Sequence, residues 1–428
     1  MLGILAVNVA HFAAPGSAAV SPDLPCPGGT ADHATWLITF VLFEGKMRAL
    51  FSMLFGASLL LFIERVDANG RDGARLQARR LLWLMLIGYL HFALLWDGDI
   101  LFLYAVVGFF ALLLRHWTPR QMVLGAALTL AVWQGWGLSI WGGSLGDEAA
   151  VVSGIASPAA QQRHAQDLAR FRADDAKDVA DSRRSWLGLA KSRLADRPGM
   201  PLNLVGFNWG ETLPWMLIGM ALLKSGFFAG AWPRRRMVQL AAGGLGLGLA
   251  ATLSFTAWAA SHHYPEIATR FAMEFGGVLP HTAMALGYAA LLVLSSPLPL
   301  AGGAGGGPVR ANEAPGAEQE PTPNPSRKRE GDSVLLRPLI VLRDQLEAAG
   351  RMAFSNYLGT SLIMTAMCYG WGLGLFGEFG AAQRWTLVLL VWALILSWSQ
   401  PWLTRYRQGP LEWLWRSLTE WRVLPFRR

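Results

Sequence analysis

The chain has 428 residues, of which 53% are hydrophobic and only 15% are charged, and it carries 20 Trp and 21 Phe. Soluble domains contain roughly a quarter charged residues, so this composition excludes an ordinary soluble protein. The formal net charge is +8, but the basic residues gather beside long apolar runs. The positive-inside rule and anionic lipids explain that placement, so we expect membrane lipids as partners and no nucleic acid.

Cysteine usage limits the chemistry further. The chain contains two cysteines, Cys26 and Cys368. They are too few for a disulfide framework or a thiolate metal site, so we predict no metal and no redox chemistry. The sequence also lacks a phosphate loop, a zinc signature and a nucleophile elbow.

Apolar runs near 20 residues with almost no charge are typical of membrane spans. These runs are continuous, whereas the strands of a membrane barrel alternate apolar and polar residues. The sequence therefore predicts an all-α, polytopic transmembrane helical bundle of about ten spans. The first run is short and lacks a charged flank, which indicates a retained, truncated helix rather than a signal peptide. The predicted helices cover residues 2–14, 34–63, 81–96, 100–114, 121–141, 205–224, 237–260, 278–297, 352–376 and 385–404.

The basic residues predict the orientation of this bundle. The loop 64–80 carries five arginines, whereas the loop 15–33 carries no Lys or Arg. The positive-inside rule places the loop 64–80 in the cytoplasm, and alternation of the spans then places both termini there. The stretch 142–204 falls outside as a polar cap, because a long segment translocates regardless of its charge.

Composition divides the chain into three parts. Residues 1–300 are predicted to form an N-terminal membrane bundle of about eight spans, which includes the cap. Residues 301–333 are rich in Gly and Pro and are expected to be a disordered cytoplasmic linker. Residues 334–428 form a C-terminal membrane segment, a pair of spans followed by an amphipathic tail helix over 409–419.

Three ionisable residues, Glu44, Lys46 and Arg48, interrupt the apolar run 34–63. A charge at membrane depth costs a few kcal/mol unless it is paired or hydrated, so such residues indicate a functional site. Glu44 and Arg48 are four residues apart on one helical face and are expected to pair, whereas Lys46 needs another partner. The alternative is that the helix begins near Ala49 and the charged side chains reach the outer interface.

His91 and a tight turn form a second candidate group. Asp97 and Asp99 lie between two predicted antiparallel helices, within a few helical turns of His91, and Tyr104 follows on the second helix. A carboxylate that accepts the imidazole N–H fixes the tautomer of the ring and makes it a general base. The alternative is that both aspartates cap the turn and that His91 is a hydrogen-bonded core residue.

Weaker candidates are Glu211 and His281 in later spans and Asn8 and His11 in the first. All fall on the outer half of the predicted topology. Polar residues from several helices at one depth predict a cavity, and we assign Asn8 and Glu211 to substrate binding together with Glu44, Lys46, Arg48 and Tyr104.

Several segments together resemble the YeiB-like bacterial inner-membrane family, whose C-terminal half is a domain of unknown function. They are the run Phe43 to Gly56, Arg79-Arg80, His91, the turn Trp96 to Leu101, Gly350-Arg351-Met352, Asn356-Tyr357, Tyr369-Gly370 and Gly409 to Thr419. The resemblance implies a multi-pass protein of the bacterial inner membrane.

That family is distantly similar to transmembrane acyltransferases such as heparan-glucosaminide N-acetyltransferase. In these enzymes acyl-CoA enters from the cytoplasm and a histidine acts within the bundle. They use an Asn in the first helix and a later outside-facing His, and the resemblance maps these onto Asn8 and His33.

Two functions are left open by the sequence. In an acyltransferase that modifies a periplasmic or outer-leaflet acceptor, His91 is the general base, Asp97 or Asp99 orients it, and Lys46 or Arg48 stabilises anionic charge. In a transporter for an anionic or lipidic solute, the same buried charges form the binding site. The substrate is a small or lipid-linked molecule in either case, and a homo-oligomer is not excluded.

Overall fold

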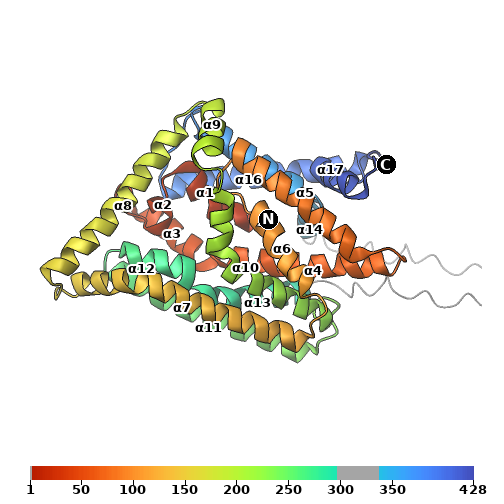
Figure 1. Ribbon diagram of the computed structural model, residues 1–428, viewed down its shortest axis with the longest axis horizontal. Coiled ribbons are helices and arrows are strands. Elements are labelled where there is room, and N and C mark those ends of the chain that lie inside the picture. Colours follow the sequence, from red (N-terminus) through yellow and green to blue (C-terminus); the bar gives the residue numbers. More distant parts are fainter. Residues whose placement is uncertain (1, 296–336) are drawn as a thin grey trace, which may run out of the picture.

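The computed structural model describes residues 2–295 and 337–428, and within these ranges the chain is helical and forms no β-strand. This confirms the all-α fold class. The predicted linker 301–333 lies outside the described residues. Figure 1 shows the arrangement of the helices. They are α1 (Leu2–Ala13), α2 (Ser17–Val20), α3 (Thr30–Leu42), α4 (Lys46–Asp67), α5 (Gly73–Leu94), α6 (Leu101–Leu113), α7 (Pro119–Val152), α8 (Pro158–Ser182), α9 (Trp186–Asp196), α10 (Met200–Lys224), α11 (Arg234–Ser261), α12 (Glu266–Phe271), the π-helix η1 (Ala272–Gly276), α13 (Val278–Ser295), α14 (Arg337–Arg351), α15 (Ala353–Cys368), α16 (Ala381–Arg405) and α17 (Pro410–Glu420).

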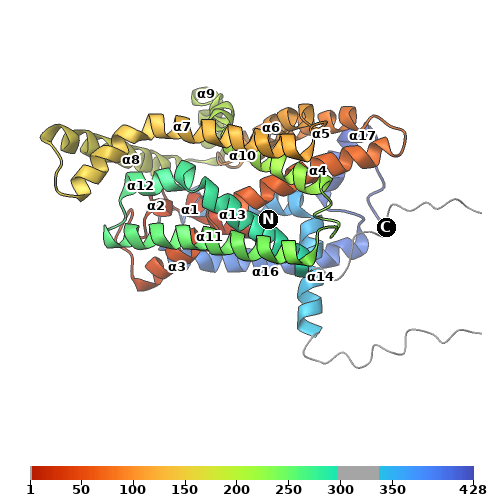
Figure 2. The same ribbon diagram turned by 90° about the horizontal axis from the view of Figure 1, so that it is seen from below.

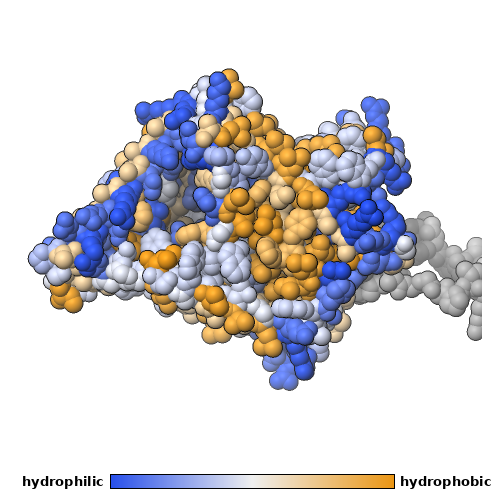
Figure 3. Space-filling view, viewed as in Figure 1, coloured by the Kyte–Doolittle hydropathy of each residue, from blue (hydrophilic) through white to orange (hydrophobic). Residues whose placement is uncertain are grey.

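Five helical stretches are long and apolar enough to cross a membrane, counted over the described residues. The predicted number of about ten spans is therefore not confirmed. Figure 3 shows hydrophilic surface along α8 and at the opposite end of the molecule, with hydrophobic surface between them. Such a band is the surface that a membrane protein presents to lipid. The five stretches are Thr30–Asp67, Pro119–Val152, Arg234–Ser261, Val278–Ser295 and Ala381–Arg405.

The prediction of one continuous helix over 34–63 is wrong, because the chain breaks between α3 and α4. Gly45 separates these helices and has a φ of +69°, a value that residues with a side chain rarely adopt. A Cβ atom at this position would overlap the ring of His281 on α13. The alternative with snorkelling charges is also wrong, because the Lys46 side chain is fully buried.

Two other predicted boundaries differ from the structure. The helix predicted over 121–141 continues as α7 to Val152, since nothing in the polar sequence after residue 141 stops it. The helix predicted over 352–376 ends at Cys368, because a glycine-rich loop follows. Gly374 and Gly377 in that loop both have positive φ values, which a helix cannot contain.

The polar segment 142–204 folds into the end of α7 and the helices α8 and α9, which run along one edge of the molecule in Figure 1. Asp175 on α8 accepts a hydrogen bond from the Ser17 amide at 3.1 Å, and Asp178 accepts one from the Gly16 amide at 3.3 Å. Arg172 forms an ion pair with Glu266 on α12. These contacts fix α8 against α2 and α12.

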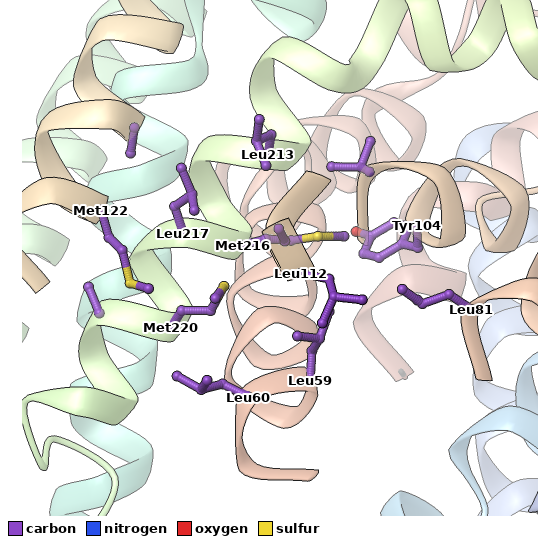
Figure 4. Close-up of a cluster of buried hydrophobic side chains, with 14 of the residues drawn as sticks. Leu59, Leu60, Leu81, Tyr104, Leu112, Met122, Leu213, Met216, Leu217 and Met220 are labelled. Atoms are coloured by element: carbon purple, nitrogen blue, oxygen red, sulfur yellow. The ribbon is translucent and has the colours of Figure 1, made fainter. Parts of the chain in front are cut away.

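The helices share two principal hydrophobic cores. The first joins α4, α5, α6, α7 and α10, and Figure 4 shows its labelled side chains, among them Leu59, Tyr104 and Met216. The second joins α1 to α15 and α16 through residues such as Phe12 and Val388. The helices α15 and α16 therefore pack directly on the first helix. Figure 2 shows α14 extending beyond the other helices, and of its described side chains only Ala348 and Ala349, at its C-terminal end, are buried among them.

The tail helix α17 begins at Pro410, as predicted, and it packs on the body of the protein. Glu412 accepts hydrogen bonds from the backbone amides of Phe354 and Ser355 and so caps α15. The Arg80 guanidinium lies between the rings of Phe62 and Trp415, at 4.0 and 4.4 Å from their centroids. The tail helix thus packs against α5 at Arg80.

We expect Gly45→Ala to destabilise the protein more than Gly70→Ala. Both glycines have φ values near +70°, but the added methyl group meets His281 at position 45 and open space at position 70. The backbone cost of about 1 kcal/mol is common to both, and overpacking adds about 1–3 kcal/mol at position 45 only. Thermal unfolding of the two purified variants measures the difference, and equal melting temperatures would contradict the close packing of Gly45 on His281.

Candidate functional site

A cavity of about 470 Å³ lies between α1, the α3–α4 break, the α5–α6 turn, α10, η1 and the polar cap. Its volume is in the range of small-molecule sites. Seven predicted substrate-binding or catalytic residues line it, namely Asn8, Glu44, Arg48, Asp97, Asp99, Tyr104 and Glu211. The structure therefore brings most of the predicted polar cluster to one place. His91 and Lys46 are not among the lining residues.

Arg48 is the central charge of this cavity. Its guanidinium lies 2.9 Å from Glu211 Oε1 and 3.6 Å from Glu44 Oε1, so it forms ion pairs with carboxylates of α10 and of the helix break. It also donates a hydrogen bond of 3.1 Å to the carbonyl oxygen of Met273 in η1. The predicted pair of Glu44 and Arg48 is thus present, and the carboxylate of Glu211 lies closer to the guanidinium than that of Glu44.

His91 forms the predicted pair with Asp99 and not with Asp97. His91 Nδ1 is 2.7 Å from Asp99 Oδ1, and both side chains are almost completely buried. Asp99 Oδ2 accepts a hydrogen bond from the Phe102 amide at 2.8 Å, so this carboxylate also caps the start of α6. His91 Nε2 is buried without a hydrogen-bond partner among the described residues. The same carboxylate therefore binds the His91 ring and caps α6.

Asp97 faces the cap instead of His91. Its Oδ1 is 3.9 Å from the guanidinium of Arg193 on α9. Arg197, which follows α9, pairs with Asp181 of α8 at 2.6 Å. The sequence predicted an outside polar cap without assigning any of its residues to the site, yet Asp178, Arg193 and Arg197 of the cap all line the cavity.

Lys46 has a structural role in the break. Its Nζ donates a hydrogen bond of 2.8 Å to the Phe40 carbonyl oxygen and lies 5.6 Å from the Phe40 ring centroid. Because α3 ends at Leu42, the carbonyls of its last turn lack helical donors, and the ammonium group supplies one. The structure therefore places Lys46 behind the cavity wall.

Tyr104 is buried at the cavity, where its hydroxyl is 2.6 Å from Ser52 Oγ of α4. Asn8 and His11 lie three residues apart on α1, a spacing that places them on one helical face, and both line the cavity. Sequence reasoning missed two further lining residues, Arg270 of α12 and Glu274 of η1. Their signal was a pair of charges four residues apart just before a predicted span.

Two other histidines lie away from this cavity. His33 Nε2 is 2.8 Å from Asp23 Oδ1, and His33 Nδ1 is 3.2 Å from the Tyr264 hydroxyl. His281 is buried against Gly45, and its Nδ1 has no partner among the described residues. Across those residues no group of three or more His, Cys, Asp or Glu side chains is arranged to hold a metal ion.

These features define an all-α protein with helices suited to a membrane and a polar cavity at a broken helix. Residues 336–422 match the domain family described as "Protein of unknown function (DUF418)". The chain is 28% identical to uncharacterized protein YeiB of Escherichia coli (strain K12), in an alignment that covers 98% of this chain and 93% of that protein. It is also 28% identical to uncharacterized protein YxaH of Bacillus subtilis (strain 168), with coverages of 98% and 91%. The domain match and the matches over nearly the full length together confirm that the chain is YeiB-like.

A third relative matches over a shorter stretch. It is an uncharacterized 39.9 kDa protein in the amylase 3' region of Bacillus acidopullulyticus, 36% identical over 109 residues, which are 25% of this chain and 29% of that protein. No solved structure matches the chain significantly. The comparisons therefore support a YeiB-like family, and they assign no activity to it.

We expect the stability of the protein to depend on pH through Asp178. The pKa of this carboxyl is raised to about 6, chiefly by burial and to a smaller extent by Asp97 and Asp175, while the hydrogen bond from the Gly16 amide lowers it. The folded protein therefore binds this proton more tightly than the unfolded chain, whose value is 3.8. Ionisation of Asp178 thus destabilises the fold as the pH rises from about 4 to above 6.

The variant Asp178→Asn isolates this effect. We expect its melting temperature to exceed that of the wild type at pH 7.5 and the advantage to vanish by about pH 4. Asp344→Asn, the same substitution at an exposed position on α14 that does not contribute to the shift of Asp178, is the control. An advantage for Asp178→Asn that grows toward low pH would contradict the raised pKa.

Proposed function

We propose that the chain is a multi-pass acyltransferase of the bacterial inner membrane, with both termini in the cytoplasm and the polar cap in the periplasm. It transfers an acyl group from acyl-CoA to an acceptor that is bound in the cavity. The observation that carries this proposal is the pair of His91 and Asp99, because Asp99 both orients the imidazole and lines the cavity. A buried His–Asp pair with a free Nε2 is the arrangement of a general base.

The proposed reaction moves one proton and exchanges one bond. His91 Nε2 accepts the proton of an acceptor N–H or O–H group, and the acceptor atom attacks the thioester carbonyl carbon. The C–S bond breaks, the acyl group stays on the acceptor, and the proton passes from the imidazolium to the thiolate sulfur. Arg48 is the proposed cation for the negative charge on the carbonyl oxygen in the transition state. Lys46 is unsuited to that role because it lies behind the wall.

The lining residues accept only part of an acyl-CoA molecule. Seven carboxylates line the cavity, and they would repel the phosphates of the nucleotide. The proposal therefore places only the acyl thioester in the cavity and the nucleotide on the cytoplasmic side. The lining groups available to the thioester and the acceptor are Arg48, Tyr104, Asn8 and His11.

The proposal requires His91 Nε2 to reach the acceptor. The ring itself does not line the cavity, whereas the neighbouring turn residues Trp96, Asp97 and Asp99 do. A movement of this turn is therefore part of the proposed mechanism. His11 faces the cavity directly, and His33 has the carboxylate of Asp23, so these two histidines are the alternatives that a test has to separate.

A second candidate function is transport, and the broken helix favours it. Irregular backbone within a membrane helix is tolerated where it lines a cavity, and transporters place their binding sites at such breaks. The break at Gly45 places Glu44 and Arg48 on the cavity. In this function the solute binds there without any covalent step.

A panel of histidine variants tests the proposal. Inverted inner-membrane vesicles that contain the protein are incubated with acyl-labelled acetyl-CoA, and the label that moves from CoA to any acceptor is measured. We expect His91→Gln to reduce this transfer about 10²- to 10⁴-fold with the fold intact, and Asp99→Asn to reduce it less, because it disturbs only the orientation of the ring.

His116→Gln, at an exposed loop position, is the matched control and is expected to keep full transfer. Loss confined to His11→Gln or His33→Gln would overturn the assignment of His91 as the base. An absence of any labelled acceptor with the wild-type protein would overturn acyl transfer itself and leave transport.

A further inference from the structure

The cavity is acidic. Seven carboxylates line it, whereas four guanidinium groups do, so the negative charges exceed the positive ones. This differs from the anionic solute that was one option for the transporter alternative. The carboxylates are Glu44, Asp97, Asp99, Asp178, Asp181, Glu211 and Glu274, and the guanidinium groups are Arg48, Arg193, Arg197 and Arg270.

Each of the four cavity arginines already lies within ion-pair distance of a carboxylate. Arg193 lies near Asp97, and Arg197 pairs with Asp181. Arg270 pairs at 2.8 Å with Glu266, which does not line the cavity. Arg48 is shared between two carboxylates, and Glu274 has no ion-pair partner among the described residues. Among the described residues, the cavity carboxylates without an arginine partner are therefore Glu274 in η1, Asp99 in the α5–α6 turn and Asp178 on α8, of which Asp99 is hydrogen-bonded to His91 and Asp178 to a backbone amide.

Two carboxylate oxygens, one in α10 and one in η1, are left without donors. Oε2 of Glu211 and Oε2 of Glu274 are buried, and neither accepts a hydrogen bond from the part of the chain that the structure describes. Glu211 is only 3% exposed. A buried acceptor without a donor costs about 1–3 kcal/mol, and more when it is charged. A ligand with N–H donors placed between these two oxygens would remove that cost.

Aromatic rings also line the cavity. Trp215 and Phe207 of α10, together with Trp96, Tyr369 and Phe376, line the same cavity. The faces of aromatic rings attract organic cations such as ammonium groups. A metal ion is less suited, because no group of three or more His, Cys, Asp or Glu side chains in the described ranges is arranged to hold one.

We infer that the cavity binds a small organic cation, with its ammonium or guanidinium group between Glu211 and Glu274. The inference rests on the proposed function, for which it names the acceptor class: a primary amine. The bound ammonium first gives one proton to the Glu274 carboxylate and becomes a free amine. As the amide bond forms, the nitrogen gives a second proton to His91, and this proton leaves on the CoA thiol. Binding requires only the cavity, so it is measured without any acyl donor. A free amine and the amine of a lipid headgroup share this chemistry.

A pair of probes of equal length and opposite charge tests the inference. 1,6-Diaminohexane and adipate are titrated separately into the purified full-length protein in detergent, and calorimetry measures binding. We expect saturable binding of the diamine and none of adipate. Glu274→Gln is expected to weaken diamine binding about 10- to 100-fold, the effect of one charge-assisted hydrogen bond.

Glu274 is the preferred position because it has no ion-pair partner among the described residues, so its substitution leaves the contacts of Arg48 in place. Glu64→Gln, an exposed carboxylate on α4 outside the cavity, is the matched control and is expected to keep wild-type affinity. Binding of adipate, failure of the diamine to bind, or equal affinity in Glu274→Gln and Glu64→Gln would each overturn the inference.

Lipid and soluble sources are separated by a competition. Phosphatidylethanolamine vesicles that displace the diamine indicate a headgroup amine, and ethanolamine alone that displaces it indicates a free amine; both outcomes support the cation site. Binding of the diamine together with failure of the acetyl-CoA assay would retain the site and overturn only acyl transfer.

Discussion

The ion pairs of Arg48 with Glu211 and Glu44 are the interaction on which the rest of the site depends. A guanidinium group taken out of water is costly, and removal of one partner of a buried pair typically destabilises a protein by about 3–5 kcal/mol. Arg48 meets that constraint by binding α10, the helix break and the Met273 carbonyl of η1 at the same time. It thereby fixes the positions of three elements around one cavity.

The packing of α4 on α10 holds these charges at a constant separation. Gly56 of α4 lies against the backbone of Met216, and Gly219 of α10 lies against the backbone of Met53, so a Cβ atom at either glycine would overlap the other helix. Close approach of helices through small residues is a common device in membrane proteins. The same two helices carry Arg48 and Glu211, so the glycine contacts and the ion pair support each other.

Much of this arrangement could be predicted from the sequence. The apolar runs predicted the helices because long uncharged apolar stretches are typical of membrane helices, even though less than half of each candidate span is buried within the protein. The rule that buried charges need partners predicted the pairing of Glu44 with Arg48 and of His91 with an aspartate. The break at Gly45 was missed because its cause, the ring of His281, is distant in the sequence. Lys46 was assigned to substrate binding, but its side chain donates a hydrogen bond to the Phe40 carbonyl oxygen. That oxygen lacks a helical donor because the helix breaks at Gly45, and the sequence did not predict the break. The contribution of the cap arises from tertiary packing, and for η1 the only sequence signal was the spacing of Arg270 and Glu274 before a predicted span.

A double-mutant cycle between Arg48 and Glu211 tests the central claim most directly. Unfolding of Arg48→Met, Glu211→Gln and the double variant is measured in detergent against the wild type. A structure organised by this pair predicts that each single variant is strongly destabilised, and that the double variant loses about 0.5–3 kcal/mol less than the two effects added together. Additive effects within experimental error would contradict it, since they would mean that Arg48 and Glu211 act independently.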